Sequence, residues 1–434
     1  MSQYTEFFVD KAIELDNSDD NYEKDLLEAA SMFRGFNEAL SIFIKEHGYT
    51  GDLADIAAKA KFLRERFREA NVKPHRDFKE FFDIDKPDKK YPRETAYRIC
   101  FALGLDVNET NDFFRRVQLE RSFDCHTIDE AVYYFCIKNC LTYSEARDIL
   151  SQITIPKKIK ALPALEILYT GTIFEHIDSL DDKEQLILYI KNNIESFRYN
   201  NATAIKYIQK LWDEISKEDG LAVKEGTIIE RSNRYVDKRR NGITDTRSSK
   251  VIAEEVRYQE QIVKPEDYVV ADSGASTWTI FSQIIGLRNY MEHEYATKYD
   301  RSLASVLTEN ALLPLNASYS FPSQHSIDRI LRGELVDNEM IRKMLIFLVF
   351  YTHWAKIIIK NNDALYSARY PDPERCLDTI NGRLLDAGYP ELYPGNPYDW
   401  LFIWSLNAER PLEAFRNYLG EVFTIKEEQD DSQE

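Results

Sequence analysis

The side chains that could do chemistry in this sequence are cysteines, histidines and carboxylates, and few of them are suitably spaced. Cys136 and Cys140 are four residues apart on a predicted helix, with Cys125 and His126 just upstream, so a zinc site can be drawn. Both cysteines lie among apolar residues, however, where cysteine behaves as a small hydrophobe. We therefore expect no metal site and no cofactor.

Two further clusters carry reactive groups without a catalytic arrangement. Met291–Glu294 contains two carboxylates and an imidazole but no second ligand pair at helical spacing, so we interpret it as a solvated face. Ser273–Ser276 lacks the strand and flanking glycines of a nucleophile elbow or a phosphate loop. The seven histidines are scattered singly, so no catalytic triad can be assigned. The sequence favours a protein that is not an enzyme, and an unrecognised enzyme is the least favoured alternative.

A short predicted helix, Ser323–Gly333, carries polar residues whose chemistry suits base recognition. Its aliphatic residues recur at the spacing of one buried face: Ile327, Ile330 and Leu331. The polar residues between them would face outward: Gln324, His325, Asp328 and Arg329. Ser323 can cap the helix by accepting from free N–H groups of the first turn. Because glutamine can bind adenine and arginine can bind guanine in bidentate fashion, this helix is a candidate for reading DNA.

The sequence of this segment, SQHSIDRILRG, resembles the recognition helix of lambda-repressor-like (XRE-type) helix-turn-helix domains. In that family a Ser-Gln pair opens the helix, an Ile packs inward, an Arg follows two residues later and a Gly ends it. The resemblance covers about 30 residues with the following helix and implies DNA contacts from Ser323, Gln324, His325 and Arg329. Two features depart from the family. The preceding segment lacks the usual Ala-Gly-bearing first helix, and Asp328 adds negative charge to the face that would meet phosphates.

An earlier segment, KPHRDFKEFFDIDKPDKKYPRETAYRICFALGL, looks like a more diverged relative of the same unit. Its outward residues would include His75, Arg76, Lys79 and Glu80, supported by a basic run: Lys86, Lys89 and Lys90. Its ending, followed by DVNETNDFF, resembles helical regulators and accessory proteins of bacterial mobile elements over about 60 residues. We expect Arg76, Lys79, Lys89 and Lys90 to contact DNA, chiefly at phosphates.

The two segments belong to an internal repeat of apolar positions. Phe78, Phe81 and Phe82 match the three aliphatic residues of the later helix at an offset of 249. At an offset of 245, four positions of the next helix match: Ala96, Ile99, Cys100 and Leu103 with Ile341, Met344, Leu345 and Leu348. At an offset of 269, the 28 residues from Phe123 match those from Leu392. We expect each short helix to pack on the helix that follows it.

Composition limits the class of protein that these elements form. Glycine and proline are sparse, at 15 and 14 of 434 residues, and 44% of residues are hydrophobic, which favours long helices and real cores. Five cysteines without a regular framework suit a reducing compartment. The N-terminal residues lack the pattern of a signal peptide, and Met344–Ile359 is shorter than a membrane helix, so we expect a core helix and a cytoplasmic protein.

The net charge of −18 argues against a uniformly basic nucleic-acid binder but leaves local patches open. Between Lys59 and Arg98 there are 13 Lys and Arg against 8 Asp and Glu. Between Lys224 and Lys250 there are 8 against 4. These two stretches could supply the charge that holds a phosphate backbone.

We therefore predict an all-α, multi-domain protein built of helical bundles with two helix-turn-helix-like units. Its predicted segments are an N-terminal helical cap (1–60), a first helix-turn-helix-like unit (61–155), a middle bundle (156–220), a polar basic linker or hairpin (221–275), a second such unit (276–424) and an acidic tail (425–434).

The function that this sequence favours is sequence-specific DNA binding, as a regulator in a bacterium or mobile element. The alternative is a non-enzymatic helical scaffold, regulatory or defensive, whose units bind protein instead. No membrane partner is expected, and a dimer is one open oligomeric state.

Overall fold

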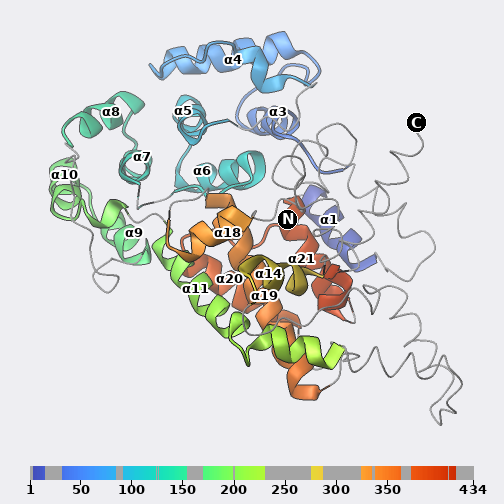
Figure 1. Ribbon diagram of the computed structural model, residues 1–434. Coiled ribbons are helices and arrows are strands. Elements are labelled where there is room, and N and C mark those ends of the chain that lie inside the picture. Colours follow the sequence, from blue (N-terminus) through green and yellow to red (C-terminus); the bar gives the residue numbers. More distant parts are fainter. Residues whose placement is uncertain are drawn as a thin grey trace, which may run out of the picture. The chain divides into compact units, whose positions relative to one another are not determined.

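The computed structural model describes residues 3–14, 32–84, 91–123, 125, 127–153, 170–198, 201–229, 275–286, 324–334, 338–362, 373–408 and 410–416. All regular secondary structure in these residues is helical (Figure 1), so the predicted all-α class is confirmed. The chain divides into two compact units. Unit 1 comprises Met1–Phe33, Ile205–Arg383 and Pro397–Glu434, and unit 2 comprises Arg34–Ala204 and Leu384–Asn396.

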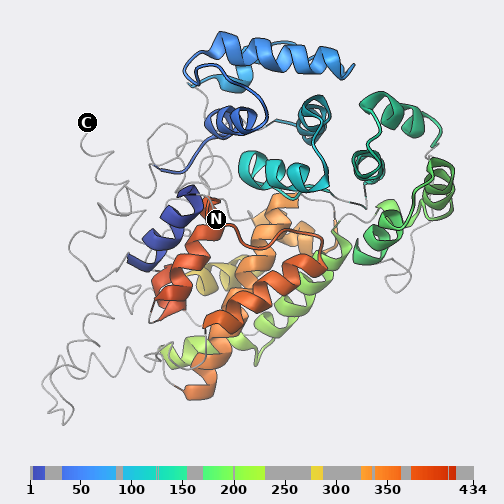
Figure 2. The ribbon, with the colours of Figure 1, turned by 180° about the vertical axis from the view of Figure 1, so that it is seen from behind.

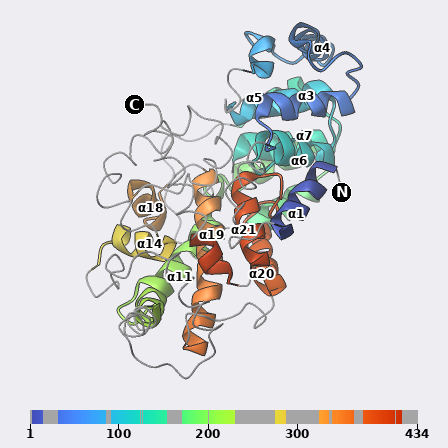
Figure 3. The ribbon, with the colours of Figure 1, turned by 90° about the vertical axis from the view of Figure 1, so that its right-hand side faces the viewer.

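Unit 2 is a stack of short helices in which α4 lies outermost, with α3 and α5 beneath it and α6 beyond them (Figures 1 and 3). Its helices are α3 (Phe36–Glu46), α4 (Ile56–Glu69), the 3-10 helix η1 (Phe78–Phe82), α5 (Arg93–Leu103), α6 (Val107–Phe113), the π-helical turn η2 (Phe114–Gln118), α7 (Ile128–Lys138), α8 (Tyr143–Ser151), α9 (Thr170–Asp178), α10 (Lys183–Asn192) and the 3-10 turn η3 (Ser196–Arg198).

Side-chain caps fix where several of these helices begin. Asp106 accepts from the backbone N–H of Glu109 at 2.8 Å, and Glu109 returns a bond to the N–H of Asp106, which makes a capping box. Thr142 and Glu145 form the same device at the start of α8. Gly104 ends α5 with a φ of 68°, a left-handed conformation that glycine adopts without steric cost. The chain therefore turns sharply between α5 and α6.

The short helix η1 is buried, as predicted, but it packs on helices other than the one expected. Phe78, Phe81 and Phe82 are each at most 2% exposed. Their neighbours are α4 and α3, which precede η1, rather than chiefly α5, which follows it. The reason is that residues 70–77 fold η1 back against α4, where Phe67 meets Phe78 edge-on with ring centroids 5.0 Å apart. The prediction that η1 packs on the helix that follows it, α5, was therefore wrong.

Unit 1 is built around the long helix α19, with α20 and α21 along it (Figure 2). Its helices are α1 (Gln3–Glu14), α11 (Ala202–Ser216), α14 (Thr277–Ile285), α18 (Gln324–Leu331), α19 (Asn338–Asn361), α20 (Pro373–Asp386) and α21 (Pro397–Asn407). Helix α11 begins, and α20 ends, just across the boundary with unit 2. Residues 221–229, at the start of the predicted polar linker, are helical and largely buried; residues 230–274 lie outside the described part.

Helix α19 is apolar on nearly all sides, which is typical of a helix inside a core. In the described part of the chain it is the one helix long and apolar enough to cross a membrane, and 67% of its most apolar stretch is buried. Tyr351 and Trp354, among its largest side chains, are fully buried. Helix α1 packs on α21, and the Trp400 indole donates to the carbonyl of Phe8 at 3.0 Å.

The predicted repeat corresponds to matching helices in the two units. At the offset of 269, α7 maps onto α21 from first to last residue, and α6 falls inside α20. At the offset of 245, α5 falls inside α19. The short helices also have similar surroundings, because η1 packs on α4 and α18 packs on α14, in each case the described helix that precedes it in the chain. In both cases the two helices that pack together belong to the same unit.

Candidate nucleic-acid interface

Helix α4 has an apolar face toward the core and a basic face toward solvent. Leu63 and Phe67 are buried at 0% and 1% exposure. Lys61, Arg64 and Arg68 are exposed and recur at i, i+3 and i+7, so they lie on one stripe of the helix. At a rise of about 1.5 Å per residue, this stripe is about 10 Å long.

The stripe continues toward η1 through the turn that follows α4. Asn71 allows the turn with a φ of 52°, in the left-handed region that asparagine tolerates better than most residues. Asp77 then caps η1 by accepting from the N–H of Lys79 at 2.9 Å. The Arg64 guanidinium lies over the Phe78 ring, 5.6 Å from its centroid, so the α4 stripe and η1 are adjacent.

We define the basic face as the exposed cations that follow α4, the turn and η1: Lys61, Arg64, Arg68, Lys73, Arg76 and Lys79. Within the described ranges none of the six side chains takes part in an ion pair. The nearby acids have local roles: Glu69 pairs with Arg66 at 3.4 Å, and Glu80 lies 3.9 Å from His75. Among the described residues the face therefore has a net positive charge that ion pairs do not compensate.

Other cations of the same basic stretch are used inside the unit. Lys59 is 6% exposed; its Nζ donates to Ser41 Oγ at 2.8 Å and lies 4.8 Å from the centroid of Phe82. Burial lowers the pKa of Lys59, although Asp52 and Asp55 nearby act to raise it. Arg98 donates to the carbonyl oxygen of Lys73 at 2.6 Å. These residues fasten α4 and its turn to the helices beneath.

Arg93 is the most heavily bonded of the internal cations. Its Nε donates to Glu130 Oε1 at 2.6 Å and its Nη1 to Glu120 Oε2 at 3.0 Å. It also donates to the carbonyl oxygens of Arg121 and Ser122, at 2.8 Å and 2.9 Å. Because two carboxylates surround it, the pKa of Arg93 is raised even though burial acts to lower it. Arg93 therefore ties α5 to α7 and to the segment that precedes α7.

The predicted recognition helix corresponds to α18, in unit 1. Ile327 and Ile330 are fully buried, and His325 is exposed. Arg329 Nε lies 3.2 Å from Glu334 Oε2, and Arg332 Nε lies 2.7 Å from Glu334 Oε1. The hydrogen bond between Arg332 and Glu334 lowers the pKa of Glu334 and raises the pKa of Arg332. Glu334 thus holds both arginines in ion pairs and balances one of their two positive charges.

The structure therefore separates the residues predicted to bind DNA. Arg76 and Lys79 lie together on the basic face of unit 2, whereas His325 and Arg329 lie on α18 of unit 1. Lys89, Lys90 and Ser323 lie outside the described residues, as does the side chain of Gln324. Four members of the basic face were not predicted from the sequence as DNA contacts: Lys61, Arg64, Arg68 and Lys73. The helical spacing of the first three was the available signal.

No group of three or more potential metal ligands is found in the described part of the chain. Four of the five cysteines are buried, and Cys140 is exposed. Burial raises the pKa of the Cys136 thiol to about 12, so it stays protonated at neutral pH.

Comparison of the chain with protein-family models, with curated proteins and with solved structures finds no match.

Proposed function

We propose that this protein is a DNA-binding regulator that holds the phosphate backbone with the basic face of unit 2. The observation that carries the proposal is the set of six exposed cations along α4, its turn and η1, none of which forms an ion pair with another described residue. In a chain with a net charge of −18, such a concentration of uncompensated charge needs a reason. Contact with phosphates supplies one, because each Lys or Arg that neutralises a phosphate releases condensed counterions.

The second part of the proposal is that α18 reads the bases, which requires a change in the ion pairs on its surface. Arg329 would have to exchange its ion pair with Glu334 for a contact with guanine. Ser323, which precedes α18 in the chain, and Gln324 and His325 in its first turn would supply the remaining contacts. The phosphate-binding role of unit 2 does not depend on this exchange.

The experiment is a salt titration of binding between the full chain and a fluorescein-labelled DNA duplex, followed by anisotropy. If six phosphates are neutralised, the logarithm of affinity falls against the logarithm of salt concentration with a slope of about −5, which is about 0.9 per contact. The double variant K61Q/R68Q removes two exposed charges that make no described side-chain contact. We expect its slope to be shallower by about 2 and its affinity at low salt to fall at least tenfold.

The matched control is K183Q/K191Q, which removes two exposed lysines of α10 that lie outside the basic face of the same unit. It should bind the duplex as the unaltered chain does. Equal effects of the two double variants would show that only overall charge matters and would overturn the assignment of the face. Complete absence of binding at low salt would overturn DNA binding itself.

The scaffold that the sequence left as an alternative has one observation in its favour. Arg329 of α18 and Arg332 just after it both pair with Glu334, so the outward surface of this helix suits contact with a protein at least as well as contact with phosphates. Loss of DNA binding on substituting the basic face, with no effect of substitutions on α18, would support separate roles for the two units.

A further inference from the structure

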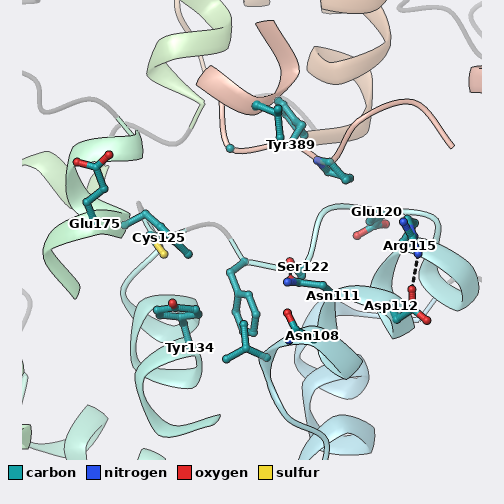
Figure 4. Close-up of a pocket in the computed structure, with 16 residues that line it drawn as sticks. Asn108, Asn111, Asp112, Arg115, Glu120, Ser122, Cys125, Tyr134, Glu175 and Tyr389 are labelled. Atoms are coloured by element: carbon teal, nitrogen blue, oxygen red, sulfur yellow. Dashed lines mark hydrogen bonds and ion pairs between the residues drawn. The ribbon is translucent and has the colours of Figure 1, made fainter. Parts of the chain in front are cut away.

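A cavity of about 530 Å³ lies in unit 2 (Figure 4), and none of the residues that line it belongs to the basic face. It is open to solvent on one side and is lined by residues of α6 and η2, the segment 120–125, α7, α9 and residues 385–390, all of which belong to unit 2. This volume falls within the range of about 300–1,000 Å³ that is typical of small-molecule sites. None of the contacts assigned to nucleic acid above uses it.

Aromatic rings form much of the wall. Phe123 meets Tyr134 edge-on at 5.1 Å between centroids, and Tyr134 meets Phe174 at 4.7 Å. The hydroxyl groups of the tyrosines are bonded to side chains that do not line the cavity: Tyr134 donates to Asp178, and Tyr389 donates to Asn201 Oδ1 at 2.7 Å. The tyrosines are therefore held in place in the wall, where they are 3% and 1% exposed and the Arg121 guanidinium covers the Tyr389 ring at 4.6 Å. Phe174 is 37% exposed, so part of the aromatic surface remains uncovered.

Two amides stand on the opposite wall. Asn108 and Asn111 are three residues apart on α6, so they share a face of the helix, and Figure 4 shows them close together beside Ser122. The Ser122 hydroxyl donates to Asn111 Oδ1, which fixes the orientation of that amide and directs its NH₂ group elsewhere. An asparagine amide offers one acceptor and a donor pair, the combination that recognises the edge of a nucleobase.

The charge of the lining disfavours an anion. Its carboxylates are Asp112, Glu120 and Glu175, and its one cation is Arg115. Arg115 is already paired with Asp112. Asp112 also pairs with Arg116, and Glu120 pairs with Arg93, so among the described residues the exposed Glu175 is the lining carboxylate for which no ion pair is found. A phosphate in the cavity would therefore meet no lining cation that lacks a carboxylate partner.

We propose that this cavity binds a neutral, planar heteroaromatic molecule of the nucleobase or nucleoside type, and that it disfavours nucleotides. The aromatic wall stacks against the ring, and the two amides read its polar edge. The lining offers a phosphate no cation that lacks a carboxylate partner, whereas its polar groups can accept the hydroxyl groups of a ribose.

The test uses adenosine as the probe and AMP as its anionic counterpart, with binding to the full chain measured by calorimetry in the absence of DNA. We expect saturable binding of adenosine and binding of AMP that is at least tenfold weaker. Asn108→Ala should weaken the binding of adenosine at least fivefold. Asn192 is an exposed asparagine on α10 that does not line the cavity, so Asn192→Ala should leave the affinity for adenosine unchanged.

A second variant tests the aromatic wall. Phe174→Ala removes a ring that is partly exposed already, so a circular dichroism melt should show an intact fold while adenosine binding falls. The proposal is overturned if neither adenosine nor guanosine nor cytidine binds, if AMP binds as well as adenosine, or if Asn192→Ala is as harmful as Asn108→Ala. Since DNA is absent, these outcomes are independent of the proposed role of the basic face.

Discussion

Arg342 and Asp399 form a bidentate ion pair inside unit 1, with Nη1 2.7 Å from Oδ1 and Nη2 2.8 Å from Oδ2. Their side chains are 3% and 1% exposed. In unit 2, Tyr97 donates to Glu130 Oε2 at 2.9 Å. At the offsets of 245 and 269, Tyr97 corresponds to Arg342 and Glu130 corresponds to Asp399. Each unit therefore joins the corresponding pair of helices with a buried bond to a carboxylate at the same repeat position.

Asp399→Ala should destabilise the protein by about 3–5 kcal/mol, because it leaves the Arg342 guanidinium buried without its counter-charge. Chemical denaturation monitored by tryptophan fluorescence measures this loss. The matched control is Glu214→Ala, which breaks the exposed pair of Glu214 with Lys356, whose side chains are 44% and 50% exposed, and should cost less than about 1 kcal/mol. Similar losses for the two variants would contradict the structural importance of the buried pair.

Phe81→Ala and Ile330→Ala should each cost about 2–5 kcal/mol in the free energy of unfolding, because both side chains are fully buried and leave cavities. Ile84→Ala provides the comparison, since Ile84 is 71% exposed and should change stability by less than about 0.5 kcal/mol. An Ile330→Ala variant as stable as Ile84→Ala would mean that α18 does not bury its apolar face.

Glu334→Gln should raise the affinity for DNA about two- to fivefold at low salt if α18 contacts the duplex, because it releases Arg329 and Arg332 from their ion pairs. Adding Arg329→Ala to this variant should cancel much of the gain. Glu218→Gln removes an exposed carboxylate elsewhere in unit 1 and controls for net charge. If Glu334→Gln has no more effect than Glu218→Gln, α18 does not meet the DNA.

His353 should make the protein less stable as the pH falls from about 6.5 to about 4. Burial, together with Arg375 and Lys356, lowers its pKa to about 4 from an ordinary value of 6.5. Between these values the unfolded chain binds more protons than the folded one, so the free energy of unfolding decreases as the pH decreases. His353→Leu should remove about 1–2 kcal/mol of this decrease, a figure reduced for the partial exposure of the ring. Denaturation of both chains at pH 7 and pH 4.5 checks the difference, and identical pH dependence would refute it.

Local patterns in the sequence determined the all-α class and much of the buried surface. Sparse glycine and proline favour helices, and the spacing of Ile327 and Ile330 defines one apolar face, because helical periodicity depends only on neighbouring residues. The same spacing predicted burial of Phe78 and Phe81 correctly. It could not indicate that η1 packs on the helices before it, because the direction in which the turn at 70–77 folds depends on the neighbours that receive it.

The tertiary structure alone decided which charges remain available. Lys59 and Lys61 are two residues apart, yet Lys59 is buried against Ser41 and Phe82 while Lys61 faces solvent, since only one of them points toward α3. In the same way the value of Arg329 as a base reader depends on Glu334, which the sequence places nearby without showing that the two meet. The cavity is assembled from residues 107–134, 174–175 and 385–390, and no local pattern links segments so far apart in the chain, because their proximity is created by packing.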